Sequence, residues 1–97
     1  MSSTFAKFRK HLEGHLIQVG AGYLIKTSFL TMYLTFGDEY FKTEQFWIAH
    51  RVTRYQADYD KEYLFGILLT ATINLQHKTI LKYEESRDGI FAWHEFK

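Results

Sequence analysis

Residues 63–75 read Tyr-Leu-Phe-Gly-Ile-Leu-Leu-Thr-Ala-Thr-Ile-Asn-Leu, a run without one charged residue in a 97-residue chain of which 24% is charged. Because so apolar a run must be covered by the remainder of the chain, it is the predicted core element. Its 13 residues fall short of the ~20 that a helix needs to cross a bilayer. We therefore expect a core element and no membrane anchor.

Two periodicities overlap in this run. Residues 69–75 alternate apolar and polar side chains, as a half-buried strand does. In contrast, Tyr63, Ile67 and Ala71 recur every four residues, as on one side of a helix. The acidic residues within 58–62 suit the first turn of such a helix, where carboxylates meet the positive end of its dipole. The helical interpretation is favoured, and the strand stays open as the alternative.

The rest of the chain contains further helical patterns. Residues 4–19 form the clearest amphipathic helix, and Gly20 and Gly22 end it. Shorter patterns follow between residues 27 and 36, from residue 43 towards 59, near residues 80–84, and after Ser86, a candidate cap for the last helix. No proline, linker or repeat divides the chain.

The patterns together predict an all-α fold, a small single-domain bundle of about five helices spanning residues 1–97. The last pattern stops at Lys97 without a stop signal, so we expect a helix truncated there. The predicted core residues are Phe5, Phe8, Leu12, Leu64, Ile67, Leu68, Ala71, Leu75 and Trp93.

Composition excludes several classes of protein. The formal net charge is +1, so no field of the whole molecule attracts nucleic acid or an anionic membrane. The absence of cysteine excludes disulfides and thiolate metal sites and fits an intracellular protein. The start of the chain does not resemble a secretory signal, and we expect a cytoplasmic location.

Motifs for catalysis, metals and cofactors are weak. His11 and His15 have metal-ligand spacing on a helix, but no third ligand is implied, and His15 belongs to the apolar stripe. A calcium loop beginning at Asp58 lacks its glycine and its final glutamate, and residues 20–25 lack the third glycine of a dinucleotide site. The adjacent Glu84 and Glu85 point about 100° apart on a helix. We expect no enzyme, no metal and no cofactor.

Two places combine features of nucleic-acid contacts. Basic residues gather in the first helix at Lys7, Arg9 and Lys10, either as a solvated face or as an edge that contacts phosphates. Aromatic and basic residues interleave at Arg51, Arg54 and Tyr55, either as an amphipathic helix with snorkelling arginines or as a stacking surface for a single strand. In both places the structural interpretation is favoured.

Three stretches together resemble the Gag-like N-terminal region of copia-type LTR retrotransposon polyproteins. They are Gly20-Ala21-Gly22-Tyr23-Leu24-Ile25 after an opening helix, the run at 63–75, and Tyr83-Glu84-Glu85-Ser86-Arg87-Asp88-Gly89-Ile90-Phe91-Ala92-Trp93. The most specific part is Ser86-Arg87-Asp88-Gly89 leading to Ala92-Trp93 and Phe96. The resemblance covers residues 5–97, and the Cys/His knuckle that binds RNA in this family is missing.

The resemblance implies a non-catalytic, α-helical capsid-type domain that associates with copies of itself and packages RNA. We accordingly expect a homo-oligomer, with weak RNA binding at most and Tyr40 and Phe41 as first candidates for assembly contacts. The alternative is a small helical regulatory or nucleic-acid-binding module that uses the basic first helix. A third possibility is a small-molecule binder with an aromatic pocket.

Overall fold

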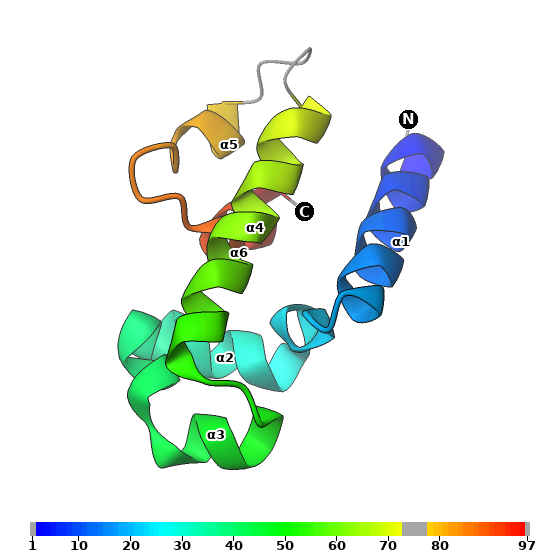
Figure 1. The fold of residues 1–97 in the computed structure, drawn as a ribbon. Coiled ribbons are helices and arrows are strands. Elements are labelled where there is room, and N and C mark those ends of the chain that lie inside the picture. Colours follow the sequence, from blue (N-terminus) through cyan, green and yellow to red (C-terminus); the bar gives the residue numbers. More distant parts are fainter. Residues whose placement is uncertain (1, 73–77, 97) are drawn as a thin grey trace.

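The computed structural model describes residues 2–72 and 78–96, and every regular element in these ranges is helical (Figure 1). The all-α prediction is therefore confirmed. In chain order the elements are α1 (Ser2–Gln18), η1 (Gly22–Ile25), α2 (Thr27–Phe36), η2 (Gly37–Lys42), α3 (Glu44–His50), α4 (Arg54–Thr72), α5 (Lys78–Leu81) and α6 (Gly89–Phe96), where η marks a 3₁₀ helix. Among the described residues, none of the helices is long and apolar enough to span a membrane.

Helix α4 is the longest element and runs through the middle of the molecule, with α1 and α5 on opposite sides of it in Figure 1. Its buried face carries Ala57, Leu64 and Leu68, which recur at intervals of seven and four residues. This spacing places all three on one side of a helix. The helical interpretation of the run at 63–75 therefore holds as far as Thr72, and residues 73–77 lie outside the described ranges.

The start of α4 differs from the sequence expectation, because the acidic residues at 58–62 lie inside the helix and not in its first turn. Thr53 caps the true start, where its Oγ1 accepts a hydrogen bond from Gln56 N at 3.1 Å. Just before this cap, Arg51 ends α3 with φ 56° and ψ 39°. The left-handed geometry at Arg51 turns the chain between α3 and α4 without a glycine.

Helix α6 lies against α4 at a very short distance, and a glycine permits it. A Cβ added at Gly89 would lie 2.6 Å from Lys61 O and 2.8 Å from Leu64 Cβ, distances that real Cβ atoms do not show. Asp88 caps this end of α6, because its Oδ1 accepts hydrogen bonds from Ile90 N and Phe91 N, each at 3.0 Å. Asp88 therefore takes the capping role expected of Ser86, whose hydroxyl instead lies 3.4 Å from Tyr83 O.

Aromatic side chains fill the base of the molecule around Phe29, which is fully buried. Its ring lies within 6.1 Å, centroid to centroid, of the rings of Tyr23, Tyr33, Tyr40, Phe41, Phe46 and His50. Tyr40 and Phe41 are only 3% and 4% exposed, so their predicted role as assembly contacts was wrong. Charged residues flank this pair in the sequence, which favours exposure, whereas η2 directs both rings inward onto Phe29.

Two buried carboxylates are satisfied by tyrosines from distant parts of the chain. The Tyr23 hydroxyl donates to Asp60 Oδ2 and the Tyr33 hydroxyl to Asp88 Oδ2, each at 2.6 Å. Gln56 Nε2 donates to the other oxygen of Asp60 at 2.8 Å. Because a buried carboxylate without partners is costly, these bonds specify how η1 meets α4 and how α2 meets the start of α6.

The predicted core residues differ in how deeply they are buried. The buried ones are Leu12, Leu64, Leu68 and Trp93, while Phe8 and Ile67 are partly buried and pack against the core. The prediction for Ala71 was wrong, because Ala71 is exposed. Ala71 lies two helical turns after Leu64, on the same side of α4. It is exposed because it lines an open cleft of about 560 Å³ beside the last turns of the helix. The side chain of Phe5 and all of Leu75 lie outside the described parts.

Gly89→Ala should destabilise the fold by about 3 kcal/mol, the upper end of the usual cost of overpacking. The added methyl group would press on the backbone of α4, which cannot turn aside as a flexible side chain can. Urea denaturation measures the loss. Gly14→Ala is the matched control, because a Cβ at Gly14 in α1 meets nothing within 4 Å, and it should leave stability unchanged or raise it by up to about 1 kcal/mol. Equal effects of the two substitutions would contradict the close packing of α6 on α4.

Stability should fall as the pH rises above about 10, the ordinary pKa of tyrosine. Burial, reinforced by the hydrogen bonds to Asp60 and Asp88, raises the pKa of Tyr23 and Tyr33 in the folded chain. The unfolded chain then releases protons that the folded chain keeps, so each tyrosine lowers the unfolding free energy by about 1.4 kcal/mol per pH unit above pH ~10.

Urea denaturation at several pH values between about 9 and 11 measures this slope. Tyr23→Phe should remove the contribution of one tyrosine and leave that of Tyr33. A slope that is the same with and without the Tyr23 hydroxyl would contradict the burial of that phenol.

Candidate interaction surfaces

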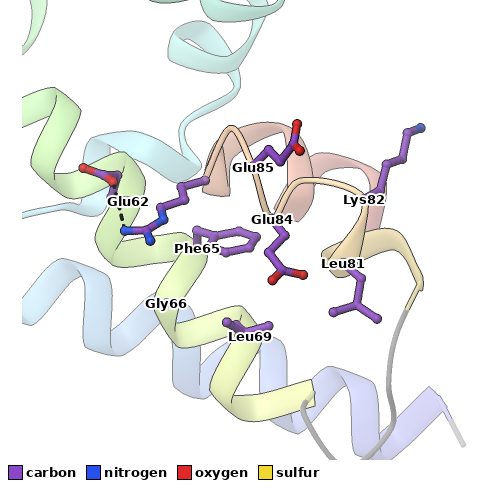
Figure 2. Close-up of a pocket in the computed structure, with 9 residues that line it drawn as sticks. Glu62, Phe65, Gly66, Leu69, Leu81, Lys82, Glu84 and Glu85 are labelled. Carbon is purple, nitrogen blue, oxygen red and sulfur yellow. Dashed lines mark ion pairs between the residues drawn. The ribbon is translucent and has the colours of Figure 1, made fainter.

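A groove of about 900 Å³ lies between α4 and the turn that follows α5 (Figure 2). Phe65 and Leu69 of α4 and Leu81 of α5 supply its apolar surface, and Gly66 adds no side chain that would fill it. Charged side chains complete the lining, namely Glu62, Lys82, Glu84, Glu85 and Arg87. We call this site the acidic groove, since three of the five charges are carboxylates.

The turn at residues 82–87 is held in place by contacts with α6. The Tyr83 hydroxyl donates to Glu95 Oε1 at 2.6 Å, and Lys82 Nζ lies 3.3 Å from the same oxygen. The hydrogen bond to Glu95, together with partial desolvation, raises the pKa of Tyr83 to about 12, and the same bond lowers the pKa of Glu95. Arg87 has φ 53° and its N–H donates to Tyr83 O at 2.7 Å, which closes the turn.

The charges of the acidic groove are only partly balanced by one another. Lys82 is engaged by Glu95, and Arg87 Nη1 lies 3.8 Å from Glu62 Oε1 across the groove. No ion pair joins Glu84 or Glu85 to any residue within 2–72 or 78–96. The rim of the groove therefore presents two carboxylates without a cationic partner in the described protomer.

A second surface lies where α3 meets α4. Trp47 and Ile48 of α3 are 45% and 58% exposed, and Tyr55 of α4 is 71% exposed. The Arg51 guanidinium lies 5.6 Å from the centre of the Trp47 ring, and that of Arg54 lies 4.9 Å from the centre of the Tyr55 ring. We call Trp47, Ile48, Arg51, Arg54 and Tyr55 the aromatic–basic corner.

A third surface runs along one side of α4, from this corner towards the C-terminal end of the helix. Tyr55, Tyr59 and Tyr63 are spaced four residues apart, and the rings of Tyr59 and Tyr63 stack with their centres 6.2 Å apart. Tyr59 is 63% exposed, whereas Tyr63 is half-buried because its hydroxyl lies 2.6 Å from His15 Nε2 of α1. We call these three residues the tyrosine ridge.

The predicted nucleic-acid edge on α1 is exposed. Lys7, Arg9 and Lys10 all reach solvent, and Arg9 Nε donates to Glu13 Oε2 at 3.1 Å. Lys7 and Lys10 form no ion pair with another residue of the described chain. The edge therefore offers two cations that are not already neutralised.

The histidine pair proposed as a weak metal signal does not converge on a site. His15 is engaged with Tyr63, as a ring stack and a hydrogen bond, and His11 is exposed one turn earlier on α1. Within residues 2–72 and 78–96, no three His, Asp or Glu side chains gather as a metal site would require.

Sequence reasoning singled out Arg51, Arg54 and Tyr55 but missed Trp47 and Ile48, and it missed the acidic groove entirely. Trp47 falls within the helical pattern that starts at residue 43, and the pattern gives no sign that its neighbours leave it 45% exposed. The groove depends on the path of the turn at 82–87. The helical pattern near residues 80–84 did not reveal this turn, because α5 ends at Leu81.

Comparisons of the chain with known protein families, with curated proteins and with solved structures found no match.

Proposed function

We propose that this chain is a non-catalytic self-association module, a helical domain that binds copies of itself. The observation that carries the proposal is the exposure of large aromatic side chains next to a well-filled core. Phe29, Tyr33 and Phe46 are almost completely buried, yet Trp47, Tyr55 and Tyr59 remain 45–71% exposed. Neighbouring exposed aromatics of this size are typical of protein–protein contacts.

The chemistry of the aromatic–basic corner supports the same role. Trp, Tyr and Arg are the residues most enriched among those that dominate binding energy at interfaces. At this corner the arginines already lie over the aromatic rings, which orders the side chains before a partner arrives. Less side-chain entropy is then lost on association.

The resemblance to Gag-like regions supports the finer proposal of a capsid-type domain. Residues 83–93, which carry the most specific part of that resemblance, form the turn of the acidic groove and most of α6. A cytoplasmic location belongs to the same proposal, since a chain without cysteine suits a reducing compartment.

Sedimentation velocity should show a mass that increases with protein concentration. Trp47→Ser combined with Tyr55→Ser should shift this association to at least tenfold higher concentration, because the exposed anchors would be lost. Ile17→Ser, which changes an exposed apolar side chain on α1 outside the three surfaces, is the control and should leave the mass unchanged. A strict monomer over the whole concentration range would refute the proposed function.

Nucleic-acid binding by α1 is a second candidate, which the exposed Lys7 and Lys10 favour, because neither forms an ion pair among residues 2–72 and 78–96. Two or three phosphate contacts support only weak, non-specific binding, with a Kd on the order of 10⁻⁴ M or weaker at physiological salt.

Fluorescence anisotropy with a labelled single-stranded RNA should show such weak binding, strongly reduced by added salt. Lys7→Glu combined with Lys10→Glu should abolish it, whereas Lys78→Glu, a reversal at the exposed start of α5, should have a smaller effect. Binding that neither salt nor the double substitution weakens would contradict a phosphate-contacting edge on α1.

A further inference from the structure

Two surfaces of this chain carry unmatched charges of opposite sign. Glu84 and Glu85 on the rim of the acidic groove have no ion-pair partner among the described residues. Arg51 and Arg54 contact aromatic rings but likewise form no ion pair there. Opposite unmatched charges of this kind are the pattern that guides two surfaces together.

The charged groups near each surface leave this imbalance in place. Glu44 lines a small cleft beside Trp47 and Arg54, and Asp58 follows Arg54 by one helical turn, but neither lies within 4 Å of an arginine nitrogen. Near the groove, Lys82 and Arg87 are already engaged by Glu95 and Glu62, respectively.

The apolar parts of the two surfaces also correspond. Trp47 and Ile48 project from the corner, whereas Phe65, Leu69 and Leu81 line the groove. A groove of about 900 Å³ lies at the upper end of the range for clefts that enclose drug-sized molecules, about 300–1,000 Å³. It therefore has room for the Trp47 indole together with an arginine side chain.

We propose that the aromatic–basic corner of one copy docks into the acidic groove of a second copy. In this contact Trp47 lies on the apolar lining of the groove, and Arg51 and Arg54 pair with Glu84 and Glu85. The inference rests on the proposed function and names the two surfaces that carry it out.

Contact between the corner and the groove requires a second copy, because the two surfaces are separate within one protomer. Figure 1 places α3 at the base of the molecule and α5 near the opposite end, with most of α4 between them. Each copy offers one corner and one groove, so the two surfaces are always present in equal number. Contacts between different patches either close into a dimer or a larger ring, or continue from copy to copy as an open chain.

Charge reversal provides the test. Glu84→Lys/Glu85→Lys and, in a separate chain, Arg51→Glu/Arg54→Glu should each weaken self-association at least tenfold in sedimentation velocity. An equimolar mixture of the two variants should regain association, since the reversed corner faces the reversed groove and the native corner faces the native groove. The fourfold variant in one chain should also regain association. Glu44→Lys/Asp58→Lys is the control near the corner and should not weaken it.

The outcomes separate this inference from the proposed function. A wild-type monomer refutes both. Wild-type association that neither double variant weakens refutes corner-to-groove docking and leaves self-association standing through another surface, the tyrosine ridge being the next candidate. Two weakened variants that the mixture does not restore also overturn the docking. If circular dichroism shows that a charge reversal unfolds the chain, neutral variants replace it. For the inference to hold, association must still weaken in Arg51→Gln/Arg54→Gln and in Glu84→Gln/Glu85→Gln.

Discussion

The contact of α6 with α4 at Gly89 is the constraint on which the rest of the fold depends. Since no side chain fits between Gly89 and the backbone of α4, the close approach of the two helices at this point requires a glycine. Asp88 then fixes the start of α6, because one of its carboxylate oxygens caps the helix and the other accepts the Tyr33 hydroxyl of α2. Three helices are thus joined within two consecutive residues, and the turn at 82–87 that forms the acidic groove leads directly into them.

The aromatic cluster around Phe29 explains how so small a chain uses so many large rings. A 97-residue chain has little interior, and its 16 Phe and Tyr residues would overfill an ordinary aliphatic core. Here α2, η2 and α3 fold into a compact unit around one phenyl ring, with neighbouring ring centres separated by 5–6 Å. This unit encloses Tyr40 and Phe41 almost completely, whereas the exposed aromatic side chains Trp47, Tyr55 and Tyr59 lie on the surface outside it.

Much of the fold could be read from periodicity, and the errors have physical causes. The helices at 63–72 and in the first 18 residues follow from the spacing of side chains such as Leu12, Leu64 and Leu68. The boundary between α3 and α4 was not predictable in the same way, because the residue that turns the chain is Arg51, and sequence rules expect glycine at such a position. The burial of Tyr40 and Phe41 depends on packing against Phe29 and Phe46, which lie 5 to 12 residues away, and the charged residues that directly flank the pair give no sign of it.

The left-handed backbone geometry at Arg51 and Arg87 lowers the stability of the fold, while the two side chains place positive charges on the surface. These two are the only non-glycine residues with positive φ in the described ranges, and each borders one of the two oppositely charged surfaces. For a residue with a Cβ, the left-handed conformation costs about 1 kcal/mol, which glycine would recover. Selection for the most stable isolated protomer would thus favour glycine at both positions. Each such replacement would remove one guanidinium group from the surface. A variant chosen only for heat resistance would in this way lose two exposed positive charges.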